Sequence, residues 1–120
     1  MVVLSTPNWV RRWFRGAAVY GAVALLATCL RPAPAGDVLF FHGFVGTALA
    51  FQFAFWIIGG DPVRFRPLML AAVAEKLAFV IPVAALAAAG QAAPTTLVAG
   101  AIDLVLGIGF LAAWRATPST

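Results

Sequence analysis

Four apolar runs, each close to the length that crosses a bilayer, constrain this chain more than any other feature. The runs cover residues 13–30, 38–58, 67–89 and 94–114. About 20 residues of α-helix span the roughly 30 Å hydrocarbon core of a membrane, and the proline and glycine residues between the runs favour helix ends. The sequence therefore predicts an all-α integral membrane protein, in which residues 1–120 form a single domain, an antiparallel bundle of four transmembrane helices.

The composition also favours a lipid environment. Hydrophobic residues make up 63% of the chain and charged residues only 10%, whereas a soluble domain carries about 25% charged residues. The basic residues lie at the ends of the apolar runs rather than in a polar patch, which argues against nucleic-acid binding. Cys29 is the only cysteine and His42 the only histidine, so neither an internal disulfide nor a Cys/His metal site is expected. No cofactor is expected either, since no phosphate-binding or cofactor motif is present.

The arginines indicate the orientation of the chain. Six of them flank the same ends of the predicted helices: Arg11, Arg12, Arg15, Arg64, Arg66 and Arg115. Arg31 lies on the other side, and all four tryptophans accompany the six arginines. Positive residues mark the cytoplasmic side of a membrane protein, and tryptophan favours the interface. We therefore expect a multi-pass protein of the bacterial inner (plasma) membrane with both termini in the cytoplasm.

The N-terminal part of the chain allows a second interpretation. Arg11 and Arg12 resemble a twin-arginine signal, and residues 33–35 fit a small-x-small cleavage site. Cleavage there would remove residues 1–35 and leave three helices. The first apolar run is long for a signal peptide and three more spans follow it, so an uncleaved first helix is preferred.

Polar side chains within the apolar runs are the candidate functional residues, because ionisable groups at membrane depth usually face protein or water. Glu75 shares a helical face with the small residues Ala71, Ala78, Pro82 and Ala85, and small residues permit helices to approach closely. Polar residues of the other runs also lie beside small residues. The predicted buried polar cluster consists of Tyr20, Gln52, Glu75 and Asp103.

Lys76 lies on a bulkier face of the same helix, with Val73 and Phe79. A lysine stem that leans toward the N-terminus of its helix would carry the ammonium group to the headgroups. Arg64 and Arg66 precede this helix and are placed to contact anionic headgroups. The predicted residues for headgroup or lipid contact are therefore Arg64, Arg66 and Lys76.

Two carboxyl groups in one dry cluster are costly to keep ionised together, so one should be protonated, or neutralised by Lys76 or an arginine. Three roles are open for the pair. It can belong to a hydrogen-bonded network that sets helix register, to a site for a proton, ion or ligand, or to an acid/base pair. No residue is assigned as catalytic.

The segment DPVRFRP (residues 61–67), followed by Glu75 and Lys76, is the most specific motif of the chain. Weaker motifs are FHGF (residues 41–44), Gln52 with Phe55, and Asp103 with Leu104. Together they resemble a family of small uncharacterised bacterial integral membrane proteins with four helices. The resemblance covers about residues 11–117 and implies an uncleaved four-helix chain without implying an activity.

Three functional hypotheses follow. The leading one is a non-enzymatic accessory or scaffold protein that binds lipid or another apolar molecule between its helices. The second is an oligomeric proton-coupled transporter or channel that uses the buried carboxyls, and the third is a membrane-embedded acid/base enzyme with a lipophilic substrate. The expected partners are membrane lipids, with a homo-oligomer or a larger membrane complex as further candidates.

Overall fold

The computed structural model describes residues 5–119, and over these residues the protein has four α-helices and no strand. The helices are α1 (Asn8–Cys29), α2 (Val38–Gly60), α3 (Arg66–Ala88) and α4 (Pro94–Ala116). The bounds of α2, α3 and α4 lie within two residues of the predicted runs, whereas α1 begins at Asn8 rather than at residue 13. Arginine is a good helix former, so Arg11 and Arg12 are part of the helix instead of preceding it.

The helix ends show how proline and glycine divide the chain. Pro67 and Pro94 lie in the first turns of α3 and α4, where a missing N–H group costs nothing. Gly36 and Gly90 have φ angles of 88° and 71° in the two loops at the far end of the molecule, a conformation that glycine adopts without strain. Pro82 lies inside α3 and does not end it.

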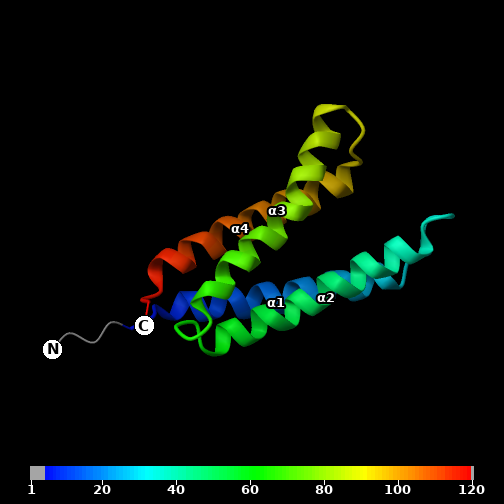
Figure 1. Cartoon of the computed structure of the whole chain (residues 1–120). Helices are drawn as coiled ribbons and strands as arrows, with labels where there is room; N and C mark the ends of the chain where they lie inside the picture. Colours follow the sequence, from blue (N-terminus) through cyan, green and yellow to red (C-terminus); the bar gives the residue numbers. More distant parts are fainter. Residues whose placement is uncertain (1–4, 120) are drawn as a thin grey trace.

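The four helices form two antiparallel hairpins. Figure 1 shows α1 lying along α2 and α3 lying along α4, with the hairpins close together near the chain termini and apart at the other end. Contacts between the hairpins are few and involve α1 with α4 and α2 with α3. The predicted antiparallel connectivity is therefore present, but the helices are packed as one bundle over only part of their length.

The hairpins meet around a core of aromatic side chains. Phe14 of α1 stacks on Phe110 of α4, with ring centroids 4.4 Å apart, and Phe55 of α2 lies 4.8 Å from Phe110. All three rings are fully buried. Trp13 donates a hydrogen bond from its indole N–H to the carbonyl of Leu106 at 3.2 Å. A core of this kind buries a large apolar area in a short length of helix.

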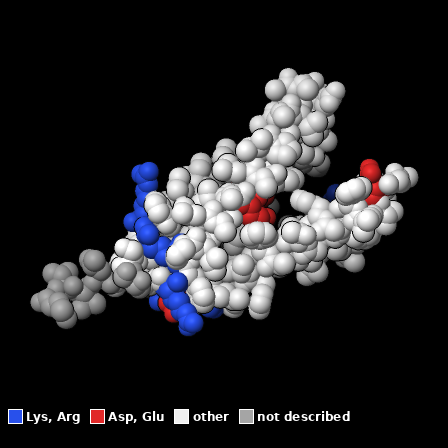
Figure 2. Space-filling view, viewed as in Figure 1, with Lys and Arg blue, Asp and Glu red and all other residues white. Residues whose placement is uncertain are grey.

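The core lies next to the end of the molecule that carries Arg11, Arg12, Arg15, Arg64, Arg66 and Arg115. We call this end the arginine end and the opposite end, with Gly36 and Gly90, the open end. Figure 2 shows the basic side chains gathered at the arginine end. Three helices, α2, α3 and α4, are long and apolar enough to cross a membrane. The bounds of α1 include three arginines, which lower its mean hydropathy.

The seam between α3 and α4 corrects the predicted orientation of α3. Ala71, Ala78, Pro82 and Ala85 are exposed, whereas Lys76 and Val83 are buried. The small residues at this seam are contributed by α4: a Cβ atom added to Gly100 would lie 2.7 Å from Cγ1 of Val83. The bulkier face of α3 therefore packs against glycines of α4, and the stripe of small residues on α3 faces outward.

Candidate functional site

Three ionisable residues meet halfway along the α3/α4 hairpin. The Nζ atom of Lys76 lies 3.4 Å from Oε2 of Glu75 and 3.3 Å from Oδ1 of Asp103, to which it donates a hydrogen bond. Glu75 and Lys76 are neighbours on α3, and Asp103 comes from α4. We call Glu75, Lys76 and Asp103 the charged triad.

Packing around the lysine stem holds the triad in place. Lys76 is 4% exposed. Its stem packs against Gly107 of α4, where an added Cβ atom would lie only 3.1 Å from the Cβ of Lys76. Its ammonium group lies 5.4 Å from the ring centroid of Phe55, a cation–π distance. Because Phe55 belongs to α2 and to the aromatic core, this contact links the triad to the second hairpin.

The Lys76 side chain points into the α3/α4 seam, whereas the sequence interpretation directed it toward lipid headgroups. The glycine at position 107 accepts the lysine stem, and the two carboxylates compensate the ammonium charge inside the protein. A buried cation with two anionic partners avoids the cost that an unpaired charge would carry at membrane depth. The expectation that Lys76 could neutralise the carboxyl groups agrees with these distances.

The triad carries one more carboxylate than it has cations, and it is open on one side. The Glu75 and Asp103 side chains are 14% and 18% exposed, and the buried Oε2 of Glu75 is ion-paired with Lys76 at 3.4 Å without a hydrogen bond. A partly exposed carboxylate that shares its only cation with a second carboxylate favours a hydrogen-bond donor from outside the protein. The triad can therefore accept a proton, or a donor group of a bound molecule.

The triad lies where the two hairpins separate. Figure 2 shows acidic side chains at the middle of the molecule, at the inner end of a hollow between the two hairpins. One turn beyond Lys76, Phe79 of α3 faces Phe44 of α2, with ring centroids 6.1 Å apart. We call the hollow between the hairpins, from the triad to the open end, the inter-hairpin cleft.

Two members of the predicted polar cluster lie elsewhere. Gln52 is 4% exposed and sits in the α1/α2 seam, where Nε2 donates to the carbonyl of Ala48 at 2.9 Å and Oε1 has no partner. Gly21 of α1 leaves the space that the Gln52 side chain fills. Tyr20 is 40% exposed. The structure thus brings Glu75 and Asp103 together and leaves Gln52 in a separate seam.

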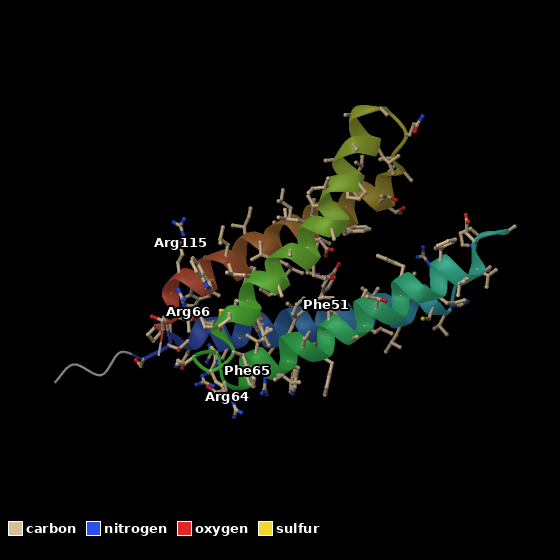
Figure 3. The ribbon with its side chains drawn as sticks, in the orientation of Figure 1. Phe51, Arg64, Phe65, Arg66 and Arg115 are labelled. Atoms are coloured by element: carbon tan, nitrogen blue, oxygen red, sulfur yellow. The ribbon has the colours of Figure 1, made fainter. Side chains whose placement is uncertain are left out.

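The two arginines predicted to contact headgroups differ from each other. Arg66 donates from Nε to the carbonyls of Trp114 and Thr117, at 3.0 and 2.7 Å, and its guanidinium carbon lies 4.4 Å from the Trp114 ring centroid. It is thus directed inward, joining the start of α3 to the end of α4. Arg64 is exposed, and Figure 3 shows it pointing away from the helices.

Sequence reasoning missed Phe55 as a member of the site and included Lys76 only as one possible counter-ion of the carboxyl groups. The available signal was Gly107, which lies four positions after Asp103 on one face of α4 and is small enough to admit a long side chain. Within residues 5–119, no group of three His, Cys, Asp or Glu residues is arranged to hold a metal ion. Comparison with protein-family models, curated proteins and solved structures finds no match for this chain.

Proposed function

We propose that this chain is an integral membrane protein whose hairpins cross the bilayer with the arginine end at the cytoplasmic face. Each helix has 22 or 23 residues, or about 34 Å of length, enough to cross the hydrocarbon core. Large apolar side chains such as Leu39, Phe53 and Ile108 are more than half exposed, as lipid contact requires. The start of α1 and the end of α4 lie together with these arginines (Figure 1), which supports a cytoplasmic location for both termini.

Within this frame, we propose that the protein binds a neutral lipid in the inter-hairpin cleft, with the polar head of the lipid at the charged triad. The observation that carries the proposal is a triad with two carboxylates and one cation that is partly exposed where the hairpins part. The proposed role is binding rather than catalysis.

The depth of the triad restricts the ligand. Lys76 follows Arg66, the first residue of α3, by ten positions, or about 15 Å along the helix axis. That distance is close to half of the roughly 30 Å hydrocarbon thickness, too deep for a phosphodiester headgroup. The surplus carboxylate favours a head that donates a hydrogen bond. A lipid with a hydroxyl head, such as a diacylglycerol or a long-chain alcohol, meets both conditions.

Photolabelling tests this proposal. The full-length protein in lipid nanodiscs is exposed to a long-chain alcohol that carries a diazirine, and labelled peptides are mapped by mass spectrometry. Labelling is expected to concentrate near Phe44 and Phe79, which flank the cleft. In Glu75→Gln it should fall at least about tenfold, the effect of losing a hydrogen bond to a charged group.

The matched control is Asp37→Asn, which removes an exposed carboxylate at the open end. Labelling in this variant should equal that of the wild type. Labelling spread evenly over the outer faces of α2, α3 and α4, or an equal decrease in Asp37→Asn, would contradict the proposal.

The surplus carboxylate also favours a second candidate function, proton-coupled transport. Both carboxylates lie within 3.4 Å of one ammonium group, so a proton that binds the triad neutralises its remaining negative charge. Four helices enclose little space, so this function requires an oligomer. Proton flux into proteoliposomes that is lost in Glu75→Gln and retained in Asp37→Asn would favour transport over lipid binding.

A further inference from the structure

Three arginines of α1 line a depression at the arginine end that the function proposed above does not use. Arg11, Arg12 and Arg15 surround a volume of about 270 Å³ together with Gly59 and Gly60 at the end of α2. Their spacing along α1 places Arg11 and Arg15 one turn apart on the same face. The depression is far from the charged triad and independent of it.

The guanidinium group of Arg15 is held in place on two sides. Its central carbon lies 4.0 Å from the ring centroid of Trp56, a cation–π contact. The two glycines of α2 leave room for it: a Cβ on Gly59 would lie 2.7 Å from Cγ of Arg15, and one on Gly60 would lie 2.9 Å from Nη2. The Nε–H group of Arg15 is buried and has no hydrogen-bond partner, and buried donors are normally satisfied.

Arg11 binds the carbonyl group of Gly60, which would otherwise repel an anion in the depression. The carbonyl of Gly60 is at the negative end of the α2 dipole, and Nη1 of Arg11 donates to it at 2.8 Å. The side chain of Arg12 is exposed. Over residues 5–119, ion pairs are confined to the charged triad, so no carboxylate is ion-paired with Arg11, Arg12 or Arg15.

We propose that this depression binds a phosphate group. Arginine binds phosphate through parallel N–H donors in a planar fork, and Arg15 holds its guanidinium group in a fixed orientation over Trp56 at the depression. The phosphate can belong to an anionic phospholipid, whose headgroup lies at the depth of the arginine end, or to free phosphate. Arg66 cannot serve in this way, because backbone carbonyls already accept from its Nε–H.

Competitive lipid binding tests the proposal on the full-length protein. The purified protein in mild detergent is mixed with equal amounts of phosphatidate and phosphatidylcholine, and native mass spectrometry measures the ratio of the two bound lipids. The wild type is expected to prefer phosphatidate. Arg15→Gln should lower the ratio about fivefold, which corresponds to the loss of one arginine–headgroup contact.

Arg115→Gln is the matched control, since it removes one exposed arginine from the same end and changes the net charge equally. Figure 3 shows Arg115 directed away from the body of the protein. This control should keep the wild-type ratio. Arg12→Gln, at an exposed position of the depression, provides a second test that does not disturb buried packing. An equal decrease in Arg115→Gln, or no decrease in either depression variant, would overturn the proposal.

Inorganic phosphate distinguishes the two sources of the group. Suppose that millimolar phosphate displaces phosphatidate from the wild type but does not affect the residual binding in Arg15→Gln. The site then binds free phosphate as well as lipid. Phosphatidate binding that resists inorganic phosphate assigns the site to the phospholipid. Absence of any phosphatidate preference, together with absence of phosphate binding, would refute the site itself.

Discussion

Lys76 is the residue on which the electrostatics at the middle of the α3/α4 hairpin depend. Its ammonium group lies between two carboxylates and over an aromatic ring of the other hairpin. Without it, Glu75 and Asp103 would stand together with no cation. A buried ion pair adds little net stability compared with apolar packing, whereas the removal of one partner is strongly destabilising. The same residue therefore determines both the stability of the α3/α4 hairpin and the charge presented to the cleft.

Replacement of Lys76 by methionine is expected to destabilise the protein by about 3 kcal/mol, because two carboxylates lose their shared counter-ion. The triple variant Lys76→Met, Glu75→Gln, Asp103→Asn should recover most of this loss, since no charge is left unpaired. Chemical unfolding in detergent, followed by circular dichroism, measures both changes. Equal stability of Lys76→Met and the wild type would show that the ion pairs do not contribute.

At the scale of elements, the α3/α4 seam shows how one helix orients its neighbour. Val83 and the stem of Lys76 fit against Gly100 and Gly107, which lie seven residues apart on α4. Residues spaced by seven positions share a helix face, so the two glycines form a shallow groove along α4. At the arginine end, Arg66 joins the beginning of α3 to the end of α4. The hairpin is thus specified at three points along its length.

Gly100→Ala is expected to destabilise the hairpin by about 1–2 kcal/mol, the usual cost of overpacking a tight contact. The added methyl group would lie 2.7 Å from Cγ1 of Val83. Combining Gly100→Ala with Val83→Ala should restore part of the stability, because the second change removes the colliding atoms. Thermal unfolding of the two variants and of Val83→Ala alone, which completes the double-mutant cycle, tests the coupling.

Over the whole molecule, the separation of the hairpins is the dominant feature. The protein measures 60 × 28 × 18 Å, and its two hairpins diverge from a shared aromatic core (Figure 1). In a membrane, lipid would occupy the space between the hairpins, because helices satisfy their own backbone hydrogen bonds and can expose apolar side chains to lipid. The position of the core near the arginine end therefore creates the cleft at the open end.

Spin-label distances test this divergence. On a Cys29→Ser background, which removes the only native cysteine, labels at positions 38 and 89 report the separation of α2 and α3 at the open end. Labels at positions 61 and 115 report the separation at the arginine end. The first pair is expected to be farther apart, and to move closer when a hydroxyl lipid fills the cleft. Equal distances for both pairs would indicate a parallel-sided bundle.

Labelling of the native cysteine tests the proposed orientation. Cys29 is exposed at the open end of α1, on the side opposite to the arginine end. A membrane-impermeant thiol reagent should therefore label it in intact spheroplasts. Labelling that occurs only after the membrane is permeabilised would place the open end in the cytoplasm and reverse the orientation.

The number of helices, their approximate bounds and the gathering of arginines at one end follow from the sequence alone. These properties are local, because hydropathy, proline and glycine act within a few residues of their own position. The start of α1 was predicted too late, since a charged helical turn has no distinctive apolar pattern.

Only the packing of α3 against α4 determines which face of α3 points inward, and therefore that Lys76 is buried. A helix that is apolar on all sides has no polar face to show which side points inward, so shape complementarity with the glycines of α4 chooses it. The divergence of the hairpins has the same origin: three phenylalanines from three helices converge at one end, and no local pattern in the chain reports such a meeting.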